Sequence, residues 1–219
     1  MPPIRSSPVA APLVAALETC WSAIQVQHGD VPDVVVSVGA GSTSHGRLKL
    51  GHFAAGRWQR GEDKLSELFI GGEGLRRGVI ELLATLLHEA AHGVAMTREL
   101  QDTSRQGRYH NARFRAIGEE LGLGLDHSAT DGWSTTTLAE GTAGRYTAAA
   151  AKLKRALVVH RLAEVGAGGR ANNNNGLAAL CGCPRKIRLS PGAYELGPIV
   201  CGVCRHPFIA VRADEADRA

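Results

Sequence analysis

The chain has 219 residues, enough for one medium-sized domain and a small module, and it is 44% hydrophobic, 21% charged and 5% aromatic. This composition excludes collagen-like, coiled-coil and wholly disordered proteins, and no apolar run approaches the roughly 20 residues of a membrane span. The net charge of +4 is uneven: residues 152–219 hold 11 Lys/Arg and 5 Asp/Glu, whereas residues 1–151 hold 14 and 16. The basic C-terminal third is therefore a candidate surface for nucleic acid.

The first 96 residues predict helices around a small sheet. Four apolar residues recur at helical spacing and predict an amphipathic first helix: Leu13, Leu17, Trp21 and Ile24. Three β-type runs punctuated by glycines then predict a small antiparallel sheet: residues 34–38, 47–53 and 67–70. Residues 75–96 form the strongest helical pattern, with an apolar stripe that indicates a buried face. Together these elements predict an α+β fold.

The rest of the chain alternates polar segments with helical patterns before a final module. Four segments are expected in order: a polar loop at 98–107, a helix at 111–121 that stops at Gly122, a hydroxyl-rich loop at 128–144 and a helix at 146–162. Residues 166–176 are almost entirely Gly, Ala and Asn. This low-complexity composition predicts a flexible linker to the cysteine-containing segment that follows.

His88, Glu89 and His92 form the pattern H-E-x-x-H within the strongest predicted helix. Residues four apart lie on the same helical face, so both imidazoles can bind a single ion. Zinc prefers nitrogen ligands of this kind. Glu89 lies beside the first ligand, where its carboxylate can take a proton from a water whose pKa the ion has lowered. The pattern therefore predicts a catalytic zinc site with His88 and His92 as ligands and Glu89 as the general base.

A catalytic zinc needs a third protein ligand and an open position for water. The position six residues after His92, where metzincins carry a histidine, is Arg98, and this excludes that class. His110 is the leading candidate because it follows a glycine-bearing loop and opens the next predicted helix. Three carboxylates are the alternatives: Glu119, Glu120 and Asp126. From their positions, Tyr109 and Arg105 are candidates for steadying the oxyanion.

Four of the five cysteines cluster near the C-terminus, which indicates a metal site in a reducing compartment rather than a disulfide framework. Cys201 and Cys204 have the C-x-x-C spacing that lets two thiolates reach one tetrahedral ion. The first pair is one residue closer, and 17 residues separate the pairs, which is usual for four-cysteine zinc sites. We therefore predict a zinc ribbon with one structural ion, held by Cys181, Cys183, Cys201 and Cys204.

The predicted ribbon contains a hairpin formed by residues 186–189 and 196–200, and His206 is the nearest substitute ligand if Cys181 does not reach the ion. Basic side chains give the module a positive face for phosphates: Arg185, Lys186, Arg188 and Arg205. Two aromatic residues are available for stacking on bases: Tyr194 and Phe208. We expect non-specific contact with DNA or RNA, with docking on a protein as the alternative.

Residues from about Trp21 to Leu123 resemble the SprT-like zinc metalloproteases of the Spartan type. The resemblance rests on the β-type runs, on Leu86-Leu-His-Glu-Ala-Ala-His92 and on Tyr109-His-Asn-Ala-Arg-Phe114. It implies that His88, His92 and His110 are the zinc ligands, that Glu89 is the catalytic base and that a zinc ribbon follows. Family members handle proteins attached to or near DNA, and Spartan-type members cleave DNA–protein crosslinks. The resemblance therefore implies a protein substrate and a role in crosslink repair.

These motifs fit three functions. The leading one is a zinc-dependent endopeptidase with four parts: a SprT-like domain at 1–127, a loop and connecting helix at 128–165, the linker at 166–176 and the ribbon at 177–212. The first alternative is a zinc-stabilised nucleic-acid-binding protein with little or no peptidase activity, although a structural metal site has no need of Glu89. The second is a metal-dependent amidase for small substrates. We expect two zinc ions per chain, a cytoplasmic location and no membrane partner.

Overall fold

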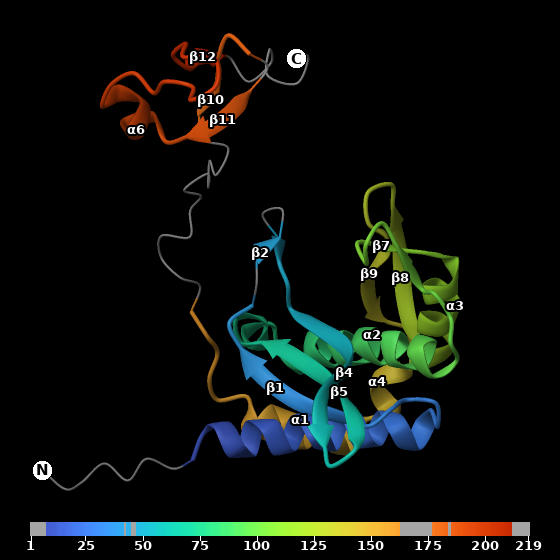
Figure 1. Cartoon of the computed structure of the whole chain (residues 1–219). Helices are drawn as coiled ribbons and strands as arrows, with labels where there is room; N and C mark the ends of the chain where they lie inside the picture. The colour runs from blue at the N-terminus through green and yellow to red at the C-terminus, as the bar shows by residue number, and fades with distance from the viewer. Residues whose placement is uncertain (1–7, 42, 45–46, 163–176, 184, 212–219) are drawn as a thin grey trace, which may run out of the picture. The chain divides into compact units, whose positions relative to one another are not determined.

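The computed structural model describes residues 8–41, 43–44, 47–162, 177–183 and 185–211 (Figure 1). The chain forms two compact units, Met1–Ala163 and Glu164–Ala219. Both units combine helices with small sheets, so the predicted α+β class is confirmed. The predicted linker at 166–176 lies outside the described residues.

A three-stranded sheet organises the first half of the first unit. The elements of this half are, in chain order, α1 (Ala10–Gln27), β1 (Val34–Gly39), β2 (Thr43–Ser44), β3 (Arg47–Leu48), β4 (Gly51–Arg60) and β5 (Asp63–Gly71). The strand order is β1-β5-β4, with β4 antiparallel to β5 but β1 parallel to it. The prediction of an antiparallel sheet is therefore wrong for β1. A tight turn at Gly61 reverses the chain between β4 and β5, which leaves β1 to pair with the opposite edge of β5.

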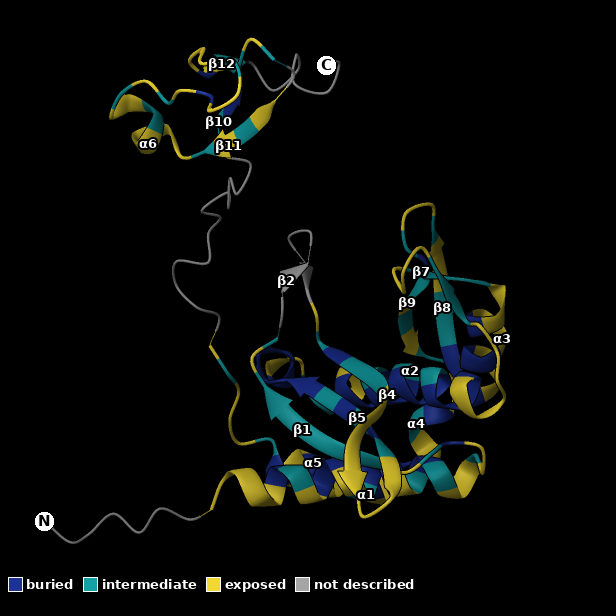
Figure 2. Ribbon diagram, in the orientation of Figure 1, coloured by how far each residue is buried: buried dark blue, intermediate teal, exposed yellow. Residues whose placement is uncertain are grey.

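The helices α1 and α2 supply most of the core of this unit. All four apolar positions predicted for the first helix are buried in α1, which packs on β1, α2 and α5. α2 (Val79–Thr97) begins four residues later than predicted, because Gly72–Arg77 form a 3-10 helix and Gly78 adopts a φ of +96°. Figure 2 shows α2 as a largely buried helix. Among the described helices, α2 alone has the length and hydropathy of a membrane span, and its burial is that of a core helix.

A second sheet follows α2 and surrounds α3 (Ala112–Leu121). Its strand order is β6-β7-β9-β8, and the strands are β6 (Thr103–Ser104), β7 (Tyr109–His110), β8 (Leu123–Ser128) and β9 (Gly132–Leu138). The Asn111 side chain caps α3 by accepting hydrogen bonds from two backbone N–H groups, and Gly122 ends the helix at a φ of +92°, as predicted. The loop predicted at 128–144 is wrong, since β9 covers the hydroxyl-rich stretch. Three consecutive threonines are β-branched and favour a strand.

The first unit ends with α4 (Thr142–Arg145) and α5 (Thr147–Ala156). α5 stops six residues before the predicted end of this helix. Beyond it, the Arg161 guanidinium donates to the buried Glu73 carboxylate (Nη1–Oε1 2.9 Å), and the Arg161 backbone N–H donates to the Gly72 carbonyl (3.0 Å). Residues 128–162 therefore belong to the first compact unit, and the predicted boundary after residue 127 falls inside it.

The second unit is a small three-stranded sheet with one short helix. Its elements are β10 (Leu177–Leu180), β11 (Lys186–Leu189), α6 (Pro191–Glu195) and β12 (Ile209–Val211), and the strand order is β11-β10-β12. The hairpin predicted between 186–189 and 196–200 is wrong, because residues 186–189 pair with β10 instead. The Ser190 hydroxyl caps α6 by accepting from the Ala193 N–H, so the chain turns into a helix after β11. Ala179, Cys201 and Phe208 are buried at the centre of this unit.

Candidate metal centres

The first centre is built on α2, which carries His88, Glu89 and His92. The two histidines stand one turn apart with their ring centroids separated by 5.1 Å. The helix can lie deep in the unit because its neighbouring residues are small: Ala90, Ala91 and Gly93 are all buried. Helical spacing alone therefore brings both imidazoles to one side of a buried helix, as the sequence predicts.

The short strand β7 carries His110, whose imidazole lies next to those of His88 and His92. Its backbone N–H donates to the Asp131 carbonyl (3.0 Å), and it pairs in parallel register with Gly132 of β9. The His110 Nε2 atom lies 3.2 Å from the Nε2 of His92. One nitrogen from each of His88, His92 and His110 lies within 4.8 Å of the others, so this group can hold a metal ion.

Two side chains, Asp102 and Thr136, contact the Nδ1 atoms of His92 and His88. His92 Nδ1 lies 2.5 Å from the Asp102 Oδ2, and His88 Nδ1 lies 3.3 Å from the Thr136 hydroxyl. A carboxylate accepts hydrogen bonds, so Nδ1 of His92 is the donor in the contact with Asp102, and its Nε2 is the nitrogen left for a metal. The Asp102 contact thereby fixes the orientation of the His92 ring.

The three imidazole rings pack against one buried aromatic side chain, that of Phe114. The Phe114 ring is fully buried and lies 4.8, 4.7 and 4.5 Å from the ring centroids of His88, His92 and His110. Burial lowers the pKa of His88 well below its usual range, and the two neighbouring imidazoles lower it further. Burial likewise lowers the pKa of His110 to about 4. Both imidazoles are therefore neutral near pH 7, which is the form that binds a metal.

Glu89 stands apart from the histidine group and lines an open cleft. The cleft has a volume of about 890 Å³ and runs between β4 on one side and β6, β7 and β9 on the other. The Glu89 side chain approaches Gly51 of β4 so closely that a Cβ there would lie 3.1 Å from its Oε1. Burial raises the pKa of the Glu89 carboxyl, while His92, Lys49 and the Phe53 backbone lower it. Glu89 is thus a buried carboxylate with a raised pKa that lines the same cleft as the three imidazoles.

The three alternative carboxylate ligands lie outside this centre. Glu119 pairs with Arg115, with 2.7 Å between Oε1 and Nε, and Glu120 accepts two hydrogen bonds from Arg98. Asp126 is exposed on β8. None of the three belongs to the histidine group. Of the three candidates weighed against His110, none reaches the place where the imidazoles meet.

The two residues suggested for the oxyanion also lie away from the cleft. The Tyr109 hydroxyl is 3.1 Å from His127 Nε2, and the Arg105 guanidinium lies over the Tyr109 ring. Neither residue lines the cleft. Polar side chains that do line it include Gln106, Ser134 and Thr135.

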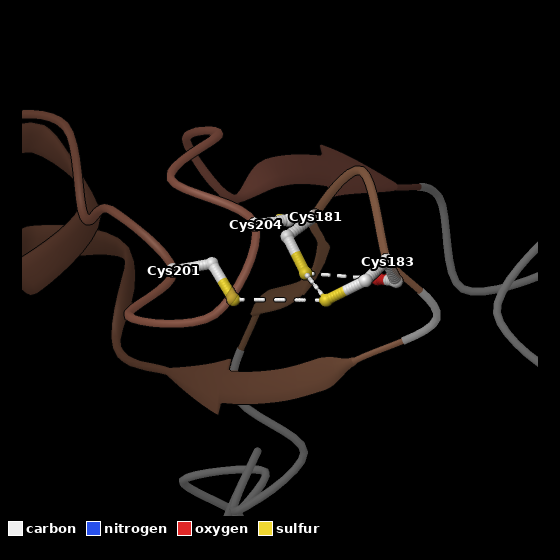
Figure 3. Close-up of side chains that lie close together, drawn as sticks. All are labelled: Cys181, Cys183, Cys201 and Cys204. Carbon is white, nitrogen blue, oxygen red and sulfur yellow. Dashed lines mark hydrogen bonds between the residues drawn. The ribbon is translucent and has the colours of Figure 1, made fainter.

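The second centre is the cysteine group of the second unit, shown in Figure 3. Cys181 and Cys183 lie in the turn between β10 and β11, with their sulfurs 3.3 Å apart. The Cys183 sulfur is 3.7 Å from that of Cys201. All four sulfurs, including that of Cys204, lie within 4.8 Å of one another. The shortened first pair therefore reaches the group, and the four cysteines can hold a metal ion.

The pKa values of the Cys204 and Cys183 thiols are shifted in opposite directions. Backbone N–H groups of the turn, that of His206 first, lower the pKa of the Cys204 thiol to about 5. The crowded sulfurs, Cys181 first, raise the pKa of Cys183 to about 12. Four thiolates therefore repel one another unless a cation lies between them. His206 is not needed as a substitute ligand because Cys181 reaches the group. The His206 Nδ1 lies instead 2.8 Å from the Cys204 carbonyl oxygen.

The basic residues predicted to contact phosphates lie on the surface of the second unit. Arg185, Lys186 and Arg188 are exposed along and before β11. The two aromatic residues considered for stacking lie inward instead. Phe208 is buried in the core of the unit, and the Tyr194 hydroxyl accepts a hydrogen bond from the Ala210 N–H (3.1 Å). Any nucleic-acid contact by this unit therefore depends on phosphates rather than on base stacking.

Comparison with known proteins adds no relative. The chain matches no protein-family model, no curated protein and no solved structure. The sites are therefore defined by their own geometry. Sequence reasoning did not identify Asp102 and Thr136 as partners of the histidines, and nothing in the local pattern marks either of them.

Replacing Asp102 with Asn should weaken metal binding at the histidine centre by roughly 10- to 100-fold, because the amide cannot stabilise the His92 imidazole as a carboxylate does. Titration with Co²⁺ against a competing chelator measures this, since thiolate ligation gives the cysteine centre a distinct absorption band. Asp126→Asn, the same change at an exposed carboxylate, is the matched control and should leave affinity unchanged. Equal affinities in the two variants would show that Asp102 does not support His92.

Proposed function

We propose that the chain is a zinc-dependent endopeptidase of the SprT-like type, acting on proteins bound to or near DNA. This proposal rests on one observation: a group of three imidazoles and a separate buried carboxylate line the same cleft. Three imidazoles converge on one point, while the buried Glu89 carboxylate lies beside them and outside the group. A purely structural metal site needs no such carboxylate facing an open cleft.

The donor set fits zinc. Three imidazole nitrogens from residues that line the cleft match the three protein ligands of catalytic zinc sites. When bound, zinc supplies Lewis acidity, which lowers the pKa of water and polarises a carbonyl. Asp102 and Thr136 hold the His92 and His88 rings in the orientation that binding requires.

Glu89 performs the proton transfers in this proposal. Its carboxylate accepts a proton from the attacking water and then donates it to the nitrogen of the leaving amine. The burial that raises its pKa makes it a stronger base than an exposed glutamate. The cleft lies beside β4, the edge strand of its sheet, so there is room for an extended polypeptide. A protein substrate therefore suits the site better than a small amide.

A second zinc ion is proposed for the four cysteines, with a structural role. Four sulfurs surround one point and leave no open position among the described residues. The exposed Arg185, Lys186 and Arg188 support contact with DNA phosphates. Together with the resemblance to Spartan-type proteases, this basic surface supports a role in removing proteins crosslinked to DNA, in the cytoplasm.

The test is metal-dependent hydrolysis by the full chain. Denatured casein and a protein crosslinked to an oligonucleotide should be cut, with fragments read by mass spectrometry. A chelator should stop the cleavage and zinc should restore it. Cleavage confined to small amides would indicate the amidase alternative. No hydrolysis by a protein shown to hold both ions would favour the zinc-stabilised nucleic-acid-binding protein.

A further inference from the structure

Five side chains of the first unit form a continuous row across β7, β8, β9 and α3. We call it the arginine–aromatic row, and in spatial order it consists of Arg105, Tyr109, His127, Trp133 and Arg115. The Arg105 guanidinium lies 4.7 Å from the Tyr109 ring centroid, and the Tyr109 hydroxyl lies 3.1 Å from His127 Nε2. The His127 and Trp133 ring centroids are 4.9 Å apart, and the Arg115 guanidinium lies 4.4 Å from the Trp133 centroid.

Arg105, His127 and Arg115 of the row are exposed, Tyr109 and Trp133 are half-buried, and the segment around the row is rich in positive charge. Residues 103–118 contain four arginines and no aspartate or glutamate. Arg105, Arg108 and Arg113 are exposed, and within the described residues none of them has an ion-pair partner. Arg115 pairs with Glu119, while Asp126 and Asp131 are the carboxylates nearest to His127 and Trp133 along the chain. Arg105 and Arg108 thus give the loop end of the row unpaired guanidinium groups, whereas the Arg115 guanidinium at the other end is paired with Glu119.

The backbone at the loop end adopts an uncommon conformation. Arg105 and Gln106 have φ values of 50° and 59°, in the left-handed region that residues with a Cβ seldom adopt, and Gly107 follows at 81°. Such conformations persist where the surrounding structure fixes them, and they cluster at binding sites. Gln106 and Gly107 line the cleft beside the histidines, so the row begins where the cleft ends.

We propose that the arginine–aromatic row binds single-stranded nucleic acid. Guanidinium groups bind the phosphates of a flexible strand, and alternating aromatic rings provide surfaces on which unpaired bases stack. Paired bases in a duplex do not expose their faces, so the row suits a single strand better. A protein or peptide partner would call for pockets rather than a surface of alternating rings and cations. The second unit lacks this chemistry, because its two aromatic residues lie inward.

This surface is distinct from the basic residues of the second unit, and it does not depend on hydrolysis. Binding can therefore be measured whether or not the chain is a peptidase. If the proposed endopeptidase activity also holds, a strand on the row would bring an attached protein to the mouth of the cleft. That consequence rests on the proposed function, whereas the binding itself does not.

The experiment uses the full chain carrying Glu89→Gln, so that no hydrolysis interferes. Fluorescence anisotropy with labelled oligo-dT and oligo-U measures affinity at several salt concentrations. Arg105→Glu with Arg108→Glu should weaken binding at least tenfold and reduce the salt slope by roughly 1.4, since each of the two lost phosphate contacts removes about 0.7. Arg57→Glu with Arg60→Glu, the same charge change at exposed positions of β4, is the matched control and should have a smaller effect.

Stacking is tested separately through His127 and Trp133. His127→Ala should weaken oligo-dT binding roughly 5- to 100-fold. In a Trp58→Phe background, bound oligo-dT should quench Trp133 fluorescence, because the remaining tryptophan, Trp21, is buried. Circular dichroism and metal content establish that each variant folds.

Three results would overturn the proposal. The first is equal binding by the row variant and its β4 control. The second is complete loss of binding when Arg185, Lys186 and Arg188 are reversed, with no effect of the row variants. The third is competition by polyglutamate as strong as by oligo-dT, which would identify the row as a surface for acidic protein.

Discussion

Glu89→Gln is expected to lower the rate of casein cleavage at least a hundredfold while the protein keeps both metal ions. The amide is nearly the same size as the carboxylate, so it fits beside Gly51 without disturbing β4. It cannot accept the proton of the attacking water, and general-base catalysis contributes roughly 10²–10⁴ to the rate. The histidine group is untouched, since Glu89 lies outside it. Initial rates, together with elemental analysis of the same samples, measure both expectations.

The matched control is Glu81→Gln, the same substitution at an exposed residue of α2 that also lines the cleft. It should retain close to wild-type activity. Full proteolysis by the Glu89 variant would reject the mechanism, because the other carboxylate of the cleft that lies beside the imidazoles, Asp102, is already engaged by His92. A loss of one ion from that variant would instead identify Glu89 as a ligand.

The double substitution Cys201→Ser and Cys204→Ser should reduce metal content from two ions per chain to one and unfold the second unit. Within the described residues, the buried hydrophobic cluster of this unit is small, consisting of Ala179, Cys201 and Phe208, whereas structural zinc supplies on the order of 10–16 kcal/mol in small zinc modules. Hydrolysis of casein should persist, because the histidine centre lies wholly within the first unit. Elemental analysis and hydrogen exchange of residues 177–211 measure the two effects.

Cys20→Ala provides the control for a lost cysteine. Cys20 is buried in α1, where burial raises the pKa of its thiol to about 11, and it belongs to neither metal-binding group. This variant should keep two ions. A wild-type content of one ion that the double substitution leaves unchanged would reject the cysteine centre.

The helix-borne part of the site is predictable from sequence because its geometry is local. His88 and His92 lie four residues apart, and any α-helix places such residues on one face. The apolar stripe that defines this helix also ensures that it is buried. The positions of α1 and α3 follow for the same reason, and Asn111 and Gly122 mark the ends of α3 by their own capping chemistry.

The rest of the site depends on contacts between distant segments. Asp102 lies in a polar loop with no periodic pattern, directly before β6, and its carbonyl accepts from the Asn111 N–H (2.9 Å). The fold of this segment, not local spacing, brings its carboxylate to His92. The run of hydroxyl side chains around Thr136 predicts a loop. Paired against β8, Thr136 is instead part of a strand whose inner face meets α2. At this position, pairing with β8 determines the secondary structure, although the polarity of the side chains favours a loop.

Phe114 links the metal centre to the stability of the whole first unit. Its ring touches three imidazoles on one side and belongs to the main hydrophobic core on the other. An ion that binds only the folded arrangement stabilises it by mass action, by about 2.7 kcal/mol when the free ion is at a hundred times its dissociation constant. The thermal midpoint of this unit should therefore rise with the free concentration of the ion. Metal supply would then set how much folded protein is present as well as how fast it works.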